Sequence, residues 1–369
     1  MYRYLIRFQY TFTSVKINNL CQNMVNIGLN GFNRIGRLFL RIALKTQCGT
    51  EQKSVGSTLP KVVIVNDPNI SPVTMSYLLR HDTFQENFNR EIIDMNNCLI
   101  IDGQRIEAVQ EKDVTKIPWH KACTIEYVVD TTGRNITCNS ASQHIQEKIK
   151  CVLVTGCADI PIFTMGVNHT CYKPLMKTAS VGTPSLNCLT AMLKVLHENF
   201  GVERAMATVI HPLSNDDMLL DDNAKSCRES RSALVNFMPA KCQEGRYVAR
   251  IMPDMEGRVG VSALKVPVAC VGGLDLTVCL RKQVAYEILT GKFKEAADCY
   301  MRGLLKCSNE ELVSSDLIGN AHACIIDVKA GSGLSPCMVK LFAWYDAEYA
   351  CAQRLYDMVK YIASREVCQ

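Results

Sequence analysis

The feature that most constrains this chain is an apolar run that leads through a glycine turn into a helical pattern. Residues 25–29 are apolar enough for a buried strand, and the helical pattern follows with Leu38, Phe39, Ile42 and Ala43. Further apolar runs, each ending in a polar turn, lie at residues 62–65, 125–129 and 151–154. Strands that alternate with helices in this way predict a parallel, doubly wound sheet, which is an α/β fold.

After residue 183 the pattern changes character. The next helix has one apolar face, formed by Leu189, Met192, Leu193 and Leu196. Apolar and polar residues then alternate over residues 274–280, as in a half-buried strand. A last helix carries Cys351, Leu355, Met358 and Ile362. We therefore predict an extension at residues 1–24, a Rossmann-like domain at 25–183, an α+β domain at 184–340 and a C-terminal helix at 341–369 that returns to the first domain.

Length and composition fit two soluble domains and exclude several other classes. The chain has 369 residues, 48% hydrophobic and 21% charged, and its net charge of +5 is too small to indicate a nucleic acid or a membrane as partner. Its 19 cysteines contain no Cys-X-X-Cys pair and no zinc-site spacing, so we expect reduced thiols in a cytoplasmic protein and no metal. Residues 1–24, basic and without acids, weakly resemble a mitochondrial presequence; the simpler alternative is a start at Met24.

The turn after the first strand is similar to the phosphate-binding turn of a Rossmann domain but departs from it at one position. Gly31 and Gly36 hold the outer positions, where a tight bend and close helix packing require glycine. Asn33 holds the middle position, and its side chain fills space that a diphosphate needs. By itself this motif is weak evidence for a dinucleotide site.

Asp67, at the end of the second strand, has two interpretations. Its carboxylate can accept hydrogen bonds from an adenosine ribose, which favours NAD over the phosphorylated cofactor. The polar insertion at residues 49–58 explains why it lies farther from Gly36 than the usual ~20 residues. The alternative is that Asn66-Asp67-Pro68 is only a turn.

Six segments, in order along nearly the whole chain, carry a resemblance to a known family. They are residues 30–37, 66–68, 165–169, 187–189 with the helix to 201, 313–316 and 344–346. The chain resembles the NAD-dependent, phosphorylating glyceraldehyde-3-phosphate dehydrogenases from residue 25 to residue 367. The resemblance implies a fold of that type, NAD as cofactor, a small-molecule substrate of glycolysis, and a homo- or hetero-tetramer. Within it, a loop at residues 214–239 would reach a neighbouring subunit's cofactor.

The resemblance also implies roles for single residues. The cofactor-binding residues are Gly31, Phe32, Asn33, Arg34, Ile35, Gly36, Asp67, Lys112, Thr131, Thr132, Gly133 and Thr155. The residues for substrate or phosphate are Thr183, Ser185, Ser214 and Lys265. In the family a cysteine thiolate attacks the aldehyde, a histidine activates that thiol, NAD takes the hydride, and phosphate attacks the thioester. His211 holds the position of the histidine.

The position of the nucleophilic cysteine, three residues before Asn187, is Pro184. A thiol at a helix N-terminus beside a histidine has a lowered pKa, and proline supplies no thiol. Proline does suit the first turn of a helix, and Thr183 before it suits the N-cap. We therefore expect the fold to persist without the chemistry.

Two neighbouring residues are weaker substitutes for the missing thiol. Ser185 is adjacent, but a hydroxyl ionises far less readily than a thiol and would give an ester. Cys188 lies one helical turn further on, and we favour a packed core thiol there. His211 is then retained only for packing or for a hydrogen bond.

The anion sites that the resemblance implies are altered as well. Asp216, two residues after Ser214, would repel a phosphate, and Lys265 replaces an arginine and its bidentate fork. Cys242-Gln243 replaces a threonine-glycine pair, and Ala347 replaces the asparagine that orients the nicotinamide. We favour a catalytically impaired member of the family. The alternatives are an aldehyde dehydrogenase that uses Cys188 with His211, and a structural partner subunit of an active paralogue.

Overall fold

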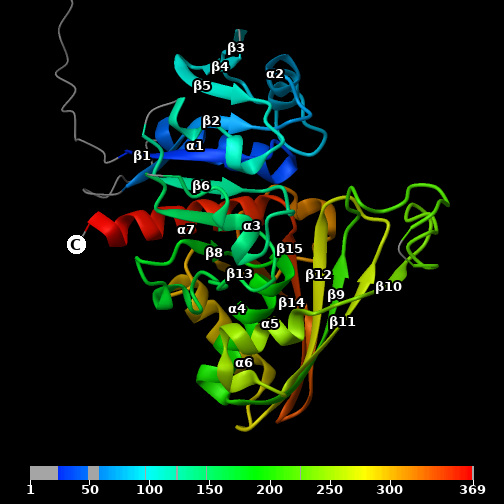
Figure 1. Cartoon of the computed structure of the whole chain (residues 1–369). Coiled ribbons are helices and arrows are strands. Elements are labelled where there is room, and N and C mark those ends of the chain that lie inside the picture. The colour runs from blue at the N-terminus through cyan, green and yellow to red at the C-terminus, as the bar shows by residue number, and fades with distance from the viewer. Residues whose placement is uncertain are drawn as a thin grey trace, which may run out of the picture.

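Two sheets organise the chain, as the computed structural model shows (Figure 1). The structure describes residues 24–48, 58–95, 97–121, 124–146, 148–224 and 226–367. The extension predicted at residues 1–24 lies outside the described residues except for Met24, which begins the first strand.

The first sheet, among the described residues, has the strand order β3-β4-β5-β2-β1-β6-β7-β8. Its strands are β1 (Met24–Asn30), β2 (Leu59–Asn66), β3 (Ile92–Met95), β4 (Cys98–Ile101), β5 (Gln104–Val109), β6 (Tyr127–Asp130), β7 (Cys151–Val154) and β8 (Thr178–Ser180). β1 pairs in parallel with β2 on one side and with β6 on the other. The chain therefore winds in both directions from β1, which confirms the predicted doubly wound sheet.

Helices cover the first sheet and complete its core. They are α1 (Arg34–Cys48), α2 (Pro72–Arg80), α3 (Cys138–Ser142) and the last helix of the chain, α7 (Tyr349–Val367), with single 3₁₀ turns at Val114–Lys116, Trp119–Lys121 and His169–Cys171. α7 lies against α1, where the rings of Phe39 and Tyr356 have centroids 6.2 Å apart. The apolar residues Leu355, Met358 and Ile362, predicted to share one helical face, are buried in that contact.

The second sheet is mixed and has the order β10-β11-β9-β12-β15-β14-β13. Its strands are β9 (Val202–His211), β10 (Met238–Ala240), β11 (Val259–Lys265), β12 (Val271–Leu280), β13 (Leu305–Ser308), β14 (Cys324–Ser335) and β15 (Met338–Asp346). Its helices are α4 (Pro184–Phe200), α5 (Glu244–Ile251) and α6 (Tyr286–Asp298), with 3₁₀ turns at Pro253–Met255 and Ser314–Leu317. These helices lie on one face of the sheet, and no described helix covers the other face (Figure 1).

The predicted domain division remains a prediction, and the structure shows where its limits fall. The limit at residues 183 and 184 lies between β8 and α4. The limit at residue 340 lies inside β15, because residues 341–346 continue the strand that pairs with β12, and the last helix begins only at Tyr349. The second sheet thus extends six residues further along the chain than predicted.

Candidate functional site

The turn that joins β1 to α1 is built on two glycines. Gly31 has a φ of +95°, which L side chains rarely adopt, and a Cβ there would lie 2.9 Å from the Thr131 hydroxyl oxygen. A Cβ on Gly36 would lie 2.1 Å from the Gly31 carbonyl oxygen. The bend and the close packing of α1 on β1 therefore both require glycine, as the motif indicated.

Asn33 caps helix α1 with its own side chain. Its Oδ1 accepts a hydrogen bond from the Gly36 N–H at 3.0 Å, and its Nδ2 donates to the Thr131 carbonyl oxygen at 2.6 Å. The free N–H groups of a helix's first turn are the groups that bind a dinucleotide's diphosphate. Because the Asn33 amide already uses one of them and bridges to β6, this turn does not fit a diphosphate in the conformation seen here.

Asp67 lies beside that turn, at the end of β2. Its Oδ2 accepts a hydrogen bond from the Phe32 N–H at 2.8 Å, and its Oδ1 accepts one from the Asn69 N–H at 3.0 Å. The carboxylate thus holds two turns together, as the turn interpretation requires. Each carboxylate oxygen can accept a further hydrogen bond, so Asp67 keeps the acceptor capacity that a ribose hydroxyl would need.

The other residues predicted for the cofactor gather at the carboxyl ends of the parallel strands, with exceptions. Thr131, which directly follows β6, donates from its hydroxyl to the carbonyl oxygens of Asn30 and Gly31. These bonds tie the end of β6 to the glycine turn. Thr132 and Gly133 continue that turn, and Thr155 follows β7. Phe32 is fully buried, Ile35 packs against the core, and Lys112 is exposed after β5.

Arg34, at the first position of α1, is already paired within the chain. Its guanidinium forms ion pairs with Glu348, next to α7, and with Asp82, and it stacks over the ring of Phe84 at 4.8 Å. Two carboxylates therefore already balance its positive charge, which leaves Arg34 less available to a cofactor phosphate.

Pro184 is the first residue of α4. Thr183 is the N-cap, and its hydroxyl oxygen accepts a hydrogen bond from the Leu186 N–H at 3.2 Å, as predicted. The proline ring thus takes a place where the helix needs no N–H, and the helix forms normally. The position predicted for the lost nucleophile carries no reactive atom.

The carboxylate of Glu244 lies directly beside that position, which the sequence analysis missed. Ser185, the second residue of α4, donates its hydroxyl hydrogen bond to Glu244 Oε1 at 3.0 Å. The Cys242 thiol and the Gln243 N–H donate to Glu244 Oε2 at 2.7 and 3.1 Å. Burial favours a raised pKa, but the hydrogen bonds from Cys242 and Ser185 outweigh it and hold the pKa of Glu244 below its ordinary value.

His211 lies at the end of β9, as predicted. Its Nδ1 is 3.5 Å from the Tyr345 hydroxyl, which donates to the Ile210 carbonyl oxygen at 3.2 Å. Burial lowers the pKa of His211, while the Glu244 carboxylate opposes that shift. No thiol of the described residues has a hydrogen bond to this imidazole, so the family's thiol and histidine pair is absent from this geometry.

Ser214 and Lys265, predicted to hold an anion, are brought together by an acid of the chain itself. The Lys265 ammonium pairs with the Asp217 carboxylate, and the Ser214 hydroxyl and N–H donate to the same carboxylate at 2.9 and 2.8 Å. Asp216, to which we ascribed the repulsion of phosphate, is exposed, and its neighbour Asp217 points inward instead. These bonds outweigh burial and lower the pKa of Asp217.

Cys188 is fully buried in the core of the second domain. Its thiol forms a hydrogen bond with the free thiol of Cys324 on β14. Burial and this hydrogen bond raise the pKa of Cys324 well above its ordinary value. The structure therefore agrees with the packed-thiol interpretation, and it shows no hydrogen bond between Cys188 and His211. The Cys242 thiol donates a hydrogen bond to Glu244. Burial and this hydrogen bond raise the pKa of Cys242 to about 12, so the Cys242 thiol is protonated at neutral pH.

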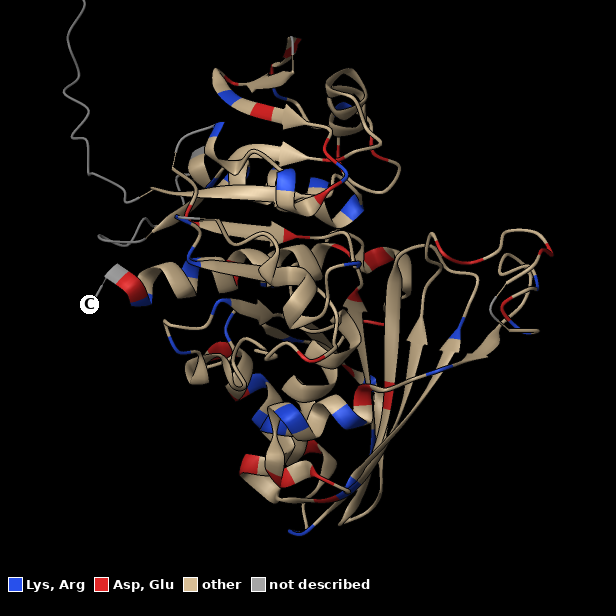
Figure 2. Ribbon diagram, viewed as in Figure 1, with Lys and Arg blue, Asp and Glu red and all other residues tan. Residues whose placement is uncertain are grey.

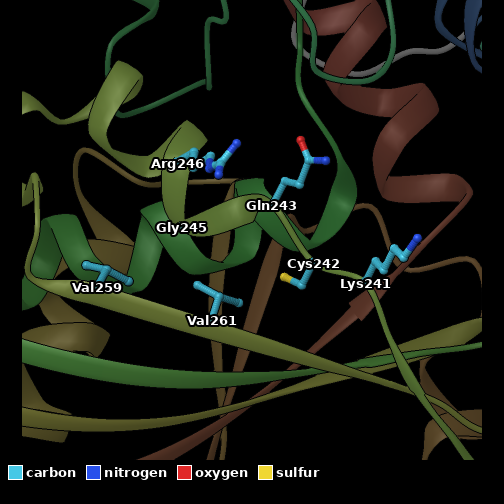
Figure 3. A pocket seen from close by; sticks show the side chains of 7 residues that line it. All are labelled: Lys241, Cys242, Gln243, Gly245, Arg246, Val259 and Val261. Atoms are coloured by element: carbon cyan, nitrogen blue, oxygen red, sulfur yellow. The ribbon is translucent and has the colours of Figure 1, made fainter.

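A pocket of about 500 Å³ opens beside the N-terminus of α5 (Figure 3). Its lining residues are Lys241, Cys242, Gln243, Gly245, Arg246, Val259 and Val261. The two valines of β11 form its floor, and the two basic side chains extend from the segment around the helix start. Since Cys242 and Gln243 line the pocket and also bind Glu244, solvent reaches the turn that holds the buried carboxylate.

The described residues contain neither a cluster of metal ligands nor a helix that could span a membrane. In the described part of the chain, no group of three or more His, Cys, Asp or Glu side chains could hold a metal ion. Within the same residues, no helix is both long and apolar enough to cross a membrane.

Sequence reasoning missed Glu244, Asp217 and Cys324 for different reasons. Glu244 directly follows the altered Cys242-Gln243 pair, so an acid in the first turn of the next helix was a visible signal. Asp217 could not be told from Asp216, because one residue of register decides which of the two faces the lysine. Cys324 is more than a hundred residues from Cys188, and nothing local in the sequence joins them.

The fold and the site define a class of protein. A doubly wound sheet with a glycine turn after its first strand, joined to a mixed sheet with a histidine beside a helix N-terminus, is the architecture of a two-domain nicotinamide-dependent dehydrogenase. Family models agree in detail. Residues 25–138 match "Glyceraldehyde 3-phosphate dehydrogenase, NAD binding domain", and residues 185–347 match "Glyceraldehyde 3-phosphate dehydrogenase, C-terminal domain".

Curated relatives give the same result. The glyceraldehyde-3-phosphate dehydrogenase of Glossina morsitans morsitans is 36% identical over 93% of this chain and 100% of its own length. Glyceraldehyde-3-phosphate dehydrogenase 1 of Saccharomyces cerevisiae is 35% identical over 92% of this chain and 99% of its own. Glyceraldehyde-3-phosphate dehydrogenase 2 of Danio rerio is 36% identical over 92% and 98%. The chain therefore belongs to the glyceraldehyde-3-phosphate dehydrogenase family, whose cofactor is NAD.

Proposed function

We infer that this protein is a cytoplasmic member of the family that keeps the fold of the enzyme but does not carry out phosphorylating oxidation of glyceraldehyde 3-phosphate. One observation carries this proposal: Pro184 occupies the first position of α4, where the family has its nucleophilic thiol. In a comparable nucleophile–base system, loss of the nucleophile lowers turnover by about a million-fold. His211 then has no thiol to activate.

The groups that would hold substrate phosphate support the same proposal. Lys265 and Ser214 are both bonded to Asp217, and Ser185 is bonded to Glu244. A phosphate would have to displace two buried carboxylates that already have charge-assisted hydrogen bonds. Weak substrate binding is therefore expected in addition to the missing nucleophile.

The nucleotide turn supports weakened binding of NAD. Asn33 must leave the Gly36 N–H and the Thr131 carbonyl before a diphosphate can use the first turn of α1. That exchange loses two hydrogen bonds, each contributing about 0.5–1.5 kcal/mol net. Asp67 remains available to a ribose, so we expect weak rather than absent affinity.

The direct test is an assay of the purified full chain. NADH formation is followed at 340 nm with glyceraldehyde 3-phosphate, NAD and phosphate, and an active member of the family is measured beside it. We expect a rate at background. Turnover comparable to that of the active enzyme would refute the proposal.

A second function, as partner subunit of an active paralogue, is favoured by exposed apolar residues on the second sheet and its long loop. They are Met206 on β9 and Leu219, Leu220, Leu234, Val235 and Phe237 before β10. Most of the length of the strands on this side is uncharged, drawn tan in Figure 2. Apolar surface of this kind is typical of a face that binds another subunit.

Coexpression with an active member of the family tests this second function. The Phe237 side chain is 72% exposed, and Phe237→Asp should abolish co-purification in a mixed tetramer. Leu175→Asp, at a residue 92% exposed on the first domain, is the matched control and should have no effect. A wild-type chain that forms only tetramers of itself would exclude the mixed assembly.

A further inference from the structure

We propose that the Glu244 carboxylate acts as a built-in anion that excludes phosphate and phosphate esters from the site between the N-termini of α4 and α5. This inference rests on the proposed function, since it describes how a site for anions comes to be filled from within this chain. The geometry around the carboxylate carries it.

Two helices begin at this carboxylate. Ser185 is the second residue of α4, which has 17 residues, and Glu244 is the first residue of α5, which has 8. The first turn of every helix leaves N–H groups without intrahelical partners, and its dipole favours negative charge there. A place where two such ends meet attracts an anion more strongly than either end alone.

The anion found at this place is a side chain of the protein. The Glu244 carboxylate accepts hydrogen bonds from the Ser185 hydroxyl, the Cys242 thiol and the Gln243 N–H, and the residue is only 8% exposed. Donors on α4 and on the segment before α5 thus converge on one carboxylate. A tetrahedral oxyanion would need the same donors and the same space.

The ion pair between Lys265 and Asp217 strengthens the exclusion of phosphate. His211 and Lys265 are register partners on the neighbouring strands β9 and β11, and Lys265 forms an ion pair with Asp217. The carboxylates of Glu244 and Asp217 and the Lys265 ammonium all act electrostatically on His211. Two negative charges against one positive charge repel a dianion in a buried site, where charges act more strongly than in water. The neutral imidazole does not offset this charge.

The pocket beside α5 shows that exclusion is not a matter of access. Lys241 and Arg246 are exposed along its lining, where they attract anions from solution. Cys242 and Gln243 form the wall between the pocket and the carboxylate. An anion that enters the pocket therefore finds the donors of Ser185, Cys242 and Gln243 already bonded to the Glu244 carboxylate.

The test measures phosphate binding to the full chain in the absence of NAD and aldehyde. Inorganic phosphate and glycerol 3-phosphate are titrated separately into wild type, Glu244→Gln and Glu244→Ala at constant ionic strength, with calorimetry and thermal shift as readouts. Glu244→Gln removes the charge, and Glu244→Ala removes both the charge and the side-chain volume. Phosphate affinity should therefore rise stepwise, by about tenfold or more for Glu244→Ala. Binding by both ligands indicates a general oxyanion site, and binding by one alone identifies the form that fits.

Glu287→Ala is the matched control, because Glu287 is an exposed acid in the first turn of α6. It should leave phosphate affinity unchanged. Wild type that binds phosphate as tightly as the alanine variant, or Glu244 variants that bind no better than Glu287→Ala, would overturn the inference. If Glu244→Ala does not fold, the phosphate affinity of Glu244→Gln is compared with those of wild type and Glu287→Ala. Either failure leaves the absence of turnover untouched, since turnover is measured in a separate assay.

Discussion

The Ser185 hydroxyl and the Glu244 carboxylate, 59 residues apart in sequence, share a hydrogen bond of 3.0 Å that joins the first turns of α4 and α5. The residue before Ser185 is Pro184, so the carboxylate lies beside the position where the family has its thiol. A thiolate there would meet a negative charge, which opposes thiol ionisation. The loss of the nucleophile and the gain of the acid therefore act in the same direction.

Restoring the thiol alone should not restore the enzyme. We expect Pro184→Cys to turn over at least about a hundredfold more slowly than an active family member, because Glu244 opposes the thiolate and the anion groups remain occupied. NADH formation and the rate of iodoacetamide alkylation measure the two effects separately. Pro184→Ala is the control, and Pro184→Cys with Glu244→Ala should alkylate faster than Pro184→Cys. Full activity of Pro184→Cys would contradict this prediction, because it would show that Glu244 and the occupied anion groups do not impair the site.

Replacing Asn33 with glycine should strengthen NAD binding. The change frees the Gly36 N–H and the Thr131 carbonyl oxygen, and we expect affinity to rise about threefold to tenfold, at a cost of a few tenths of a kcal/mol in helix capping. Thermal shift and calorimetry with NAD measure both quantities. Ser71→Gly removes the N-cap of α2 and is the matched control. Equal NAD affinity in wild type and Asn33→Gly would contradict the role given to this side chain.

The stabilising effect of Glu244 should depend on pH. Its pKa in the folded chain is below its ordinary value of 4.5, so the ionised carboxylate stabilises the fold above that pH, and this stabilisation is lost as the pH falls through the folded value. The difference in melting temperature between wild type and Glu244→Gln should stay constant at neutral pH and narrow below pH 4.5. Glu287→Gln should show little difference at any pH. If the difference in melting temperature between wild type and Glu244→Gln grew in acid, the Glu244 carboxylate would not be stabilised by its hydrogen-bond donors.

Cys188 should behave as a core thiol. We expect Cys188→Ser to lower the free energy of unfolding by roughly 1–3 kcal/mol, because it buries a hydroxyl among apolar neighbours, while Cys299→Ser at an exposed site stays within about 0.5 kcal/mol. Denaturant titration measures both. In the native protein, mass spectrometry after alkylation should find Cys171, Cys227 and Cys299 labelled before Cys188. Early labelling of Cys188 would revive the hypothesis of an aldehyde dehydrogenase that uses this thiol.

The sequence was enough to predict the doubly wound sheet and the start of α4. The strand at residues 25–29 and its glycine turn have local causes, namely apolar runs and a backbone conformation that only glycine adopts easily. Thr183 as N-cap and Pro184 as first helical residue are likewise decided within one turn of chain. Such features depend on neighbours in sequence and can be predicted from them.

The side-chain pairs of the site could not be predicted in the same way. The partner of Ser185 depends on how α5 packs against α4, and the partner of Lys265 depends on how the loop before β10 lies against β11. The two residues of each pair are 59 and 48 positions apart in the sequence. The resemblance led us to predict one acid, Asp216, at the anion site. Only the path of the chain in space shows that Asp217 faces the lysine.

The return of α7 to α1 has a consequence for the order in which this protein can fold during synthesis. The core beneath the nucleotide turn includes Leu355, Met358, Val359 and Ile362 of α7, so part of its apolar surface stays uncovered until α7 has left the ribosome. The second sheet can pair its strands earlier, because all of them precede α7. We therefore expect the first sheet, although it is translated first, to complete its core only after the second sheet has been translated.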